Sequence, residues 1–281
     1  MHLKIYTSAR EFYAESSDFL MRDEVANNLP FAVVLAHLER KPNALDPYFA
    51  QVTDNGRIVA AAARTPPRRL LLAAGESNAM EFVAENCLKS YREGLFPGVN
   101  GPLALALKFA EVWRDLTGRK FTLRRRLQWY RLDEPPPDAK VSGRLRVANR
   151  CDRELLRSWV APQIEEAQGP GGEAIAGMLV DAGIPRGRFF LWEDEAPVSM
   201  AMISRSTPNG SCISMVFTPP EFRRRGYAGA CVAAVCRELL CGGRRFCFLS
   251  ADLANSGTLR IYRDLGFSTV GESGEFDFLD R

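Results

Sequence analysis

A short arginine- and glycine-rich segment is the part of this sequence best suited to chemistry. It runs from Pro219 to Gly229 as Pro-Pro-Glu-Phe-Arg-Arg-Arg-Gly-Tyr-Ala-Gly. Backbone N–H groups left open by small residues can point at an anion where a helix begins, and arginines supply the counter-charge. Gly226, Ala228 and Gly229 would let a ligand approach closely. We therefore predict a pyrophosphate site here, against the simpler reading of a solvated basic turn.

The flanking residues predict the elements that must position this segment. Val232, Val235, Cys236 and Leu239 recur at helical spacing, which predicts a helix over 228–240 with one apolar face. Strand-like runs at 212–217 and 246–251 precede and follow that helix, and they predict an α/β arrangement in which the segment joins a strand to a helix.

A second group of polar residues lies near the end of the chain. Residues 254–267 read as a short helix, with Asn255 or Ser256 as a candidate N-cap and Gly266 as its stop. Asn255, Leu259 and Tyr262 follow an i, i+4, i+7 spacing, so we expect them to share one face. On the residues alone, Asn255 is equally a simple cap and Tyr262 a half-buried aromatic.

Together these motifs resemble those of the GNAT superfamily of N-acetyltransferases. Arg223-x-x-Gly226-x-Ala228 has the form of its acyl-CoA signature, Arg/Gln-x-x-Gly-x-Gly/Ala. The Asn255 to Tyr262 element, followed by Leu-Gly-Phe, resembles the family's Asn-x-x-(Ser/Ala)-x-x-x-Tyr element. This chain departs from the family pattern in lacking a proline after the asparagine and in placing Leu259 where a polar residue is common.

The resemblance implies how acetyl-CoA, the expected acyl donor, would bind. Strands 212–217 and 246–251 would splay apart, and pantetheine would enter the gap and bond to the first strand as if it were another strand. Asn255 would contact the pantetheine region, and Tyr262 would protonate the leaving thiolate. The residues expected to bind the cofactor are Val216, Phe217, Thr218, Arg223, Arg224, Arg225, Gly226, Tyr227, Ala228, Gly229 and Asn255.

The implied reaction is direct transfer of an acetyl group, or a longer acyl group, to a primary amine without a covalent enzyme adduct. Orientation of the two substrates would contribute most to the rate. We expect no metal, and the acceptor is a small-molecule or peptide amine. The general base stays unassigned among Glu165, Glu166, Glu173, Asp252, Ser250 and Ser214.

The Pro-rich run at 134–138 divides the chain almost in half, and the two halves show similar series of elements. We predict a degenerate GNAT-like domain at 1–134, a linker at 135–139 and a catalytic domain at 140–281. Each domain would be an α/β (α+β) fold with a mixed, mostly antiparallel sheet flanked by helices. The helix at 103–116 is matched with the one at 228–240, which leaves 79–91 as a helix inserted in the first half.

Composition bounds the class of protein. The 281 residues are 46% hydrophobic and 25% charged, with a net charge of +3 and seven cysteines without a C-x-x-C pair. These values predict a globular protein without a disulfide scaffold. No apolar run reaches the roughly 18 residues of a membrane span, and the N-terminus has no leader pattern, so we expect a cytoplasmic protein, as a monomer or homodimer.

Two rival functions remain at this stage. One is an acyl-CoA-binding sensor or pseudoenzyme without turnover. The other is a nucleic-acid-binding protein that uses its arginine clusters, but the net charge of +3 is small for such a role and no nucleic-acid partner is expected.

Overall fold

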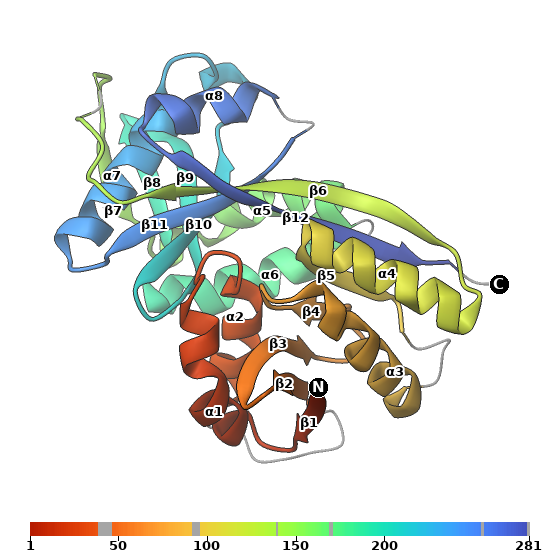
Figure 1. Cartoon of the computed structure of the whole chain (residues 1–281). Helices are drawn as coiled ribbons and strands as arrows, with labels where there is room; N and C mark the ends of the chain where they lie inside the picture. The colour runs from red at the N-terminus through yellow and green to blue at the C-terminus, as the bar shows by residue number, and fades with distance from the viewer. Residues whose placement is uncertain (39–46, 92–95, 139, 169–170, 254–255, 280–281) are drawn as a thin grey trace. The chain divides into compact units, whose positions relative to one another are not determined.

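The chain consists of two similar series of strands and helices, one in each half (Figure 1). The computed structural model describes residues 1–38, 47–91, 96–138, 140–168, 171–253 and 256–279. Each series has the order β-α-α-β-β-β-α-β-α-β. The expected mixed α/β fold, with a similar series of elements in each half, is therefore confirmed.

The first series holds β1 (His2–Tyr6), α1 (Ala9–Met21), α2 (Asn28–His37), β2 (Tyr48–Asp54), β3 (Arg57–Arg64), β4 (Leu70–Leu72), α3 (Met80–Ser90), β5 (Gly98–Pro102), α4 (Leu103–Thr117) and β6 (Phe121–Leu132). The second holds β7 (Arg144–Val147), α5 (Arg153–Gln168), α6 (Gly172–Gly183), β8 (Phe189–Asp194), β9 (Ala196–Ser206), β10 (Gly210–Phe217), α7 (Tyr227–Cys241), β11 (Phe246–Asp252), α8 (Ser256–Asp264) and β12 (Ser268–Phe278).

The match between the halves differs from the predicted one. The helix that follows β4 is α3, so α3 corresponds to α7, and α4 corresponds to α8. The reason is that β4 and β5 are parallel neighbours, as are β10 and β11. Parallel neighbours need a crossover connection, and α3 is that crossover rather than an insertion. The prediction matched α4 with α7 because a glycine precedes each helix, at Gly101 and Gly226.

The chain separates into two compact units whose borders cut across the two series. Unit 1 comprises residues 1–129, 250–255 and 269–281, and unit 2 comprises residues 130–249 and 256–268. The sheet of unit 1 has the strand order β1-β2-β3-β4-β5-β12-β6, so the last strand of the chain lies between β5 and β6. The pairing of β5 with β12 is antiparallel and runs from Pro102 opposite Ser273 to Gly98 opposite Asp277.

Helices cover both faces of the unit 1 sheet. Helices α3 and α4 bury one face, in a core that includes Trp113, Phe276 and Phe278, while α1 and α2 bury the other. The β2–β3 hairpin turns at Asn55 and Gly56, both with left-handed φ, as the Asn-Gly pair predicts. Buried Arg119 donates to the carbonyls of Phe96, Phe278 and Leu279, which ties the C-terminal strand into this unit.

In unit 2 the strand order is β11-β10-β9-β8-β7. Side chains of β8 and β9, including Leu191 and Met200, pack with α5 and α6 around Trp159. Alternate residues of these strands point to the opposite face, where α7 packs with its buried side. Helix α7 begins one residue before the predicted 228–240 and ends one residue later.

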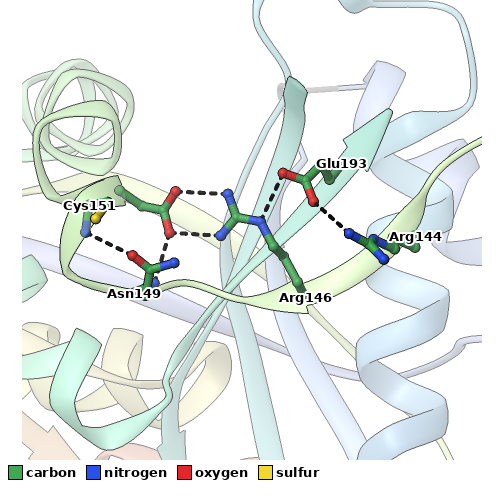
Figure 2. Close-up of polar contacts among 6 residues, drawn as sticks. Arg144, Arg146, Asn149, Cys151 and Glu193 are labelled. Carbon is green, nitrogen blue, oxygen red and sulfur yellow. Dashed lines mark hydrogen bonds and ion pairs between the residues drawn. The ribbon is translucent and has the colours of Figure 1, made fainter. Parts of the chain in front are cut away.

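A partly buried ion-pair network joins the first elements of unit 2 (Figure 2). Arg146 on β7 makes a bidentate contact with Asp152, at 2.7 and 2.8 Å, and a third bond of 3.1 Å to Glu193 on β8. Asp152 also accepts from the N–H of Asn149, whose side chain caps the short turn that opens α5. The Arg146 hydrogen bonds hold the pKa of Asp152 below its usual 3.8.

This network gives unit 2 an acid-sensitive contact. The pKa of Asp152 is lower in the folded protein than its usual value of 3.8. The ionised carboxylate therefore stabilises the folded state fully above pH 3.8, and this stabilisation is lost as the pH falls below 3.8 and the carboxylate is protonated. Asp152→Asn should lower the free energy of unfolding at pH 7 by about 2 kcal/mol and flatten its fall below pH 5, since Asp152 is 7% exposed. Urea melts from pH 3 to 7 measure both effects.

Asp181 supplies a matched control. It pairs with Arg153 at 2.6 Å, but both side chains are largely exposed, so Asp181→Asn should change the free energy of unfolding much less than Asp152→Asn does. Equal losses in the two variants would contradict the assignment.

Candidate active site

Strand β10 bends where it leaves its neighbour β11. The parallel pairing of the two strands runs from Gly210 opposite Phe246 to Cys212 opposite Phe248, although β10 continues to Phe217. On its other side β10 pairs with β9 through Ser214–Met202 and then Phe217–Met200. Two residues of β10, Met215 and Val216, therefore oppose a single residue of β9. This is a β-bulge, and bulges bend and twist a strand.

Met215 marks the bulge with a left-handed φ of 49°. Beyond it, the Ser199 hydroxyl donates to the carbonyl oxygen of Phe217 at 2.9 Å and lies 2.9 Å from the Thr218 hydroxyl, which fixes the end of the strand. The edge of β10 beyond Cys212 has no ladder pair with β11 in the described part of the chain. The splay implied for these strands is thus present, and the bulge was the feature that the sequence did not reveal.

The loop after β10 leads into α7 through two left-handed residues. A short 3-10 turn at Pro220–Phe222 is followed by Arg224 with φ 63° and by Gly226 with φ 86°. Such alternation turns successive N–H groups toward one side, as in anion-binding concavities. The first bond of the helix is donated by Ala230 to the Gly226 carbonyl. Among the described residues, the backbone N–H groups of 224–229 donate no hydrogen bond to a backbone carbonyl.

The three arginines of the loop are exposed but not equivalent. The Nε atom of Arg223 donates to the Thr218 carbonyl at 3.0 Å, so this side chain closes the loop. The Arg225 guanidinium lies 5.8 Å from the centre of the Phe222 ring. Arg223 and Arg224 form no ion pair with a carboxylate in the described ranges. Free N–H groups at a helix start and cations without a protein counter-ion together make a site that an anion fits.

Tyr227, the first residue of α7, turns its side chain into the protein. It is 8% exposed, and its hydroxyl donates to Asp194 at 2.6 Å. The Ser142 hydroxyl donates to the same carboxylate oxygen at 2.8 Å. The bond from Tyr227, followed by that from Ser142, lowers the pKa of Asp194. Sequence reasoning missed Asp194 and Ser142, because both lie far from the loop in the chain.

Tyr262 lies on α8 and is almost fully buried. Its ring packs against Tyr130 at 6.0 Å and Phe267 at 5.8 Å between centroids. Burial is the main cause that raises the pKa of its hydroxyl, so this phenol stays protonated at neutral pH. Asn255, the expected partner of pantetheine, lies outside the described residues. Gly266 ends the helix with φ 90°, as predicted.

The candidate bases remain unassigned. Glu165 and Glu166 are exposed, and Glu173 pairs with Arg157 at 2.9 Å. Asp252 pairs with Arg125 at 3.5 Å within unit 1. The Ser214 hydroxyl, beside the bulge, is buried and has no partner in the described part of the chain.

The residues that the structure describes show neither a metal-binding cluster nor a membrane-spanning helix. They contain no group of three or more His, Cys, Asp or Glu side chains arranged to hold a metal ion. No helix among them combines the length and the apolar character needed to cross a membrane.

The corresponding loop of unit 1, between β4 and α3, is closed by its own protein contacts. The N–H of Ala74 donates to the side chain of Asn27 at 2.7 Å, and that of Glu76 to the Val59 carbonyl at 2.8 Å. The carboxylate of Glu76 adds a negative charge there, paired with Arg57. Strands β4 and β5 also stay in contact at their ends, since a Cβ on Gly101 would lie 2.8 Å from the Leu72 Cβ.

Comparison with known proteins agrees with this geometry. Residues 151–267 match the acetyltransferase (GNAT) family, so the second half of the chain carries a GNAT-family domain. No curated protein matches the chain in sequence.

Solved structures resemble the whole chain. A GNAT-family acetyltransferase from Colwellia psychrerythraea has a TM-score of 0.61 at 10% identity, over 99% of this chain and 100% of that one. A GCN5-related N-acetyltransferase from Sphaerobacter thermophilus has 0.62 at 17% identity, over 98% and 95%. A tandem GNAT protein from the clavulanic acid biosynthesis pathway has 0.55 at 11% identity, over 99% and 98%. At these identities the likeness establishes the fold alone, and that fold is consistent with a tandem arrangement.

Proposed function

We propose that this protein is an N-acetyltransferase that moves an acetyl group from acetyl-CoA to a primary amine. The observation that carries the proposal is the pair of open features in unit 2: the unpartnered N–H groups that start α7, and the β10 edge freed beyond Cys212. They lie at the two ends of one connection, Thr218–Gly226, as a ligand with both a pyrophosphate and an extended amide chain requires. Anion binding at the helix start and strand-like pairing at the edge are the physical basis.

In this proposal the N–H groups of residues 224–229, together with Arg224 and Arg225, bind the pyrophosphate. Arg223 holds the loop through Thr218. Backbone groups of Val216 and Phe217 pair with pantetheine, and Asn255 contacts the same arm. The amine nitrogen attacks the thioester carbonyl carbon and the C–S bond breaks. Tyr262 gives its proton to the departing sulfur, and the amine proton passes to water.

Tyr262→Phe tests the proposed acid. The ring contacts with Tyr130 and Phe267 are kept, so the fold and CoA binding should not change. The kcat should fall about 10-fold; the loss is modest because a thiol with a pKa near 8.5 is already a fair leaving group. Steady-state rates beside CoA titrations measure both quantities. A kcat equal to that of the wild type would remove Tyr262 from the mechanism.

We also propose that only the second half, residues 140–281, binds acyl-CoA, and that residues 1–134 are a degenerate copy joined by the linker at 135–139. The β4–α3 loop supports this, because its N–H groups already bond to Asn27 and Val59. Calorimetric titration should therefore give one CoA per chain. A stoichiometry of two would contradict the proposal.

Measuring the release of CoA thiol distinguishes an acetyltransferase from a CoA-binding sensor without turnover. Acetyl-CoA is incubated with a panel of primary amines, including polyamines, amino sugars and peptide N-termini, and free thiol is followed with a chromogenic reagent. The proposal expects thiol release with at least one amine and an acetylated product by mass spectrometry. Tight CoA binding without release across the panel would favour the sensor.

A further inference from the structure

The residues just after the β6 strand run beside helix α7 and contact it at two places. Near the C-terminal half of the helix, Arg237 donates to the carbonyl of Pro136 at 3.5 Å and pairs with Asp138 at 2.7 Å. At the other end of the helix, Val141 lies so near Gly226 that a Cβ there would be 2.9 Å from its Cγ1 atom. We call residues 136–138 and 140–143 the strap.

The two contacts lie far apart along α7, because Gly226 and Arg237 are separated by eleven residues, or about 16 Å along a helix axis at 1.5 Å per residue. Pro135, Pro136 and Pro137 stiffen the start of the strap. The ion pair of Asp138 with Arg237 contributes little to holding the strap, because Asp138 is 92% exposed. The stiffness of the proline run is therefore needed to keep the strap beside α7.

The end of the strap is fixed beside the first residue of α7. Ser142 donates to Asp194 through its hydroxyl and accepts from the Trp192 ring N–H at 2.9 Å through its carbonyl. Tyr227 donates to the same Asp194 oxygen. Gly143, with φ 102°, allows this close approach, since a Cβ there would lie 2.6 Å from both the Glu193 carbonyl and the Trp192 ring nitrogen. One carboxylate thus joins the strap to the start of α7.

The hydroxyls of Ser142 and Tyr227 also offset the negative charge of Asp194. Asp194 is ionised at neutral pH, and it lies close to the loop that is proposed to bind a dianion. The bonds from Tyr227 and Ser142, together with the favourable charge of Arg225, offset this negative charge. Without the two hydroxyls only Arg225 would offset the charge of this carboxylate beside the ligand, and the start of α7 would lose its anchor.

We propose that the strap is a positioning element: through the Ser142–Asp194–Tyr227 contacts it sets the N–H groups at the start of α7 and so controls affinity for the pyrophosphate of CoA. This inference rests on the proposed function. Ser142, Asp194 and the Tyr227 side chain are positioning residues, since they act through the backbone of the loop. Such groups raise affinity by holding a site in its bound geometry before the ligand arrives.

The test compares CoA with pantetheine, which lacks the pyrophosphate. The double variant Ser142→Ala/Tyr227→Phe should bind CoA about 10-fold more weakly, as expected for two lost hydrogen bonds to one carboxylate, and pantetheine unchanged. Replacing Pro135-Pro136-Pro137 by Gly-Ser-Gly should give the same selective loss without touching the carboxylate. Equilibrium titrations of the 281-residue chain and of both variants measure the affinities for CoA and for pantetheine.

Ser158→Ala is the matched control, because it removes an exposed hydroxyl that bonds to the Leu155 carbonyl of its own helix, away from α7. It should leave both affinities at the wild-type value. Equal weakening of CoA and pantetheine in the double variant, or no weakening of either, would overturn the inference while leaving CoA binding itself intact. Failure of the wild type to bind CoA would instead overturn the proposed function.

Discussion

Removal of residues 269–281 is expected to unfold unit 1, although these residues lie at the opposite end of the chain from most of it. Strand β12 pairs with β5 from Ser273 to Asp277, and Phe276 and Phe278 are 3% and 6% exposed in the unit 1 core. Losing one buried phenylalanine costs about 3–5 kcal/mol, and a domain is stable by about 5–15 kcal/mol. Losing both rings together with the strand pairing should exceed that margin.

Hydrogen exchange on the truncated chain measures this effect. Amides of β2, β3 and β5 should lose protection, and addition of a peptide of residues 268–281 should restore it. Phe278→Ala is a milder version that should cost about 3–5 kcal/mol, whereas Val270→Ala, at a position 40% exposed on the same strand, should cost less than 1 kcal/mol. A stable, cooperatively folding fragment of residues 1–134 would contradict this account.

Gly226→Val is expected to weaken CoA binding by about 100-fold or more. The residue has a φ of 86°, which a β-branched side chain rarely adopts, and a Cβ would lie 2.9 Å from the Val141 side chain. Either the turn or the strap must move, and the N–H groups that start α7 would lose their common direction. An anion held mainly by such groups should then lose most of its affinity.

Gly243 supplies a matched control for backbone strain. It follows the other end of α7 with φ 95°, and a Cβ there would meet nothing within 4 Å. Gly243→Val should therefore cost comparable stability, measured by thermal melting, but leave the Kd for CoA unchanged. Wild-type CoA affinity in Gly226→Val would rule out the loop as the pyrophosphate site.

Local features of the fold were accessible from the sequence. An Asn-Gly pair is typical of a tight hairpin turn, as Asn55 and Gly56 are in the β2–β3 hairpin, and the spacing of Val232, Val235 and Cys236 predicts the buried face of α7. Both depend on residues close together in the chain, where turn chemistry and helical periodicity act directly. The start of α7 could likewise be predicted from Gly226, which directly precedes the helix in the chain.

Features that depend on distant residues were not accessible. The place of β12 beside β5 pairs Gly98 with Asp277, and nothing local to either strand encodes that pairing. The predicted match of α4 with α7 was wrong. A glycine before a helix does not indicate which strands are parallel neighbours, and it is the parallel pairs β4–β5 and β10–β11 that identify the corresponding helices. The bulge at Met215 and the link from Asp194 to Tyr227 arise from packing between elements, so only the folded chain reveals them.

A crystal structure with bound CoA would locate the ligand directly. We expect one CoA in unit 2, with its pyrophosphate oxygens about 2.9 Å from backbone nitrogens of residues 224–229 and its pantetheine alongside β10 beyond Cys212. CoA bound instead at the β4–α3 loop of unit 1, or in unit 2 without contact between its pyrophosphate and the start of α7, would contradict this expectation.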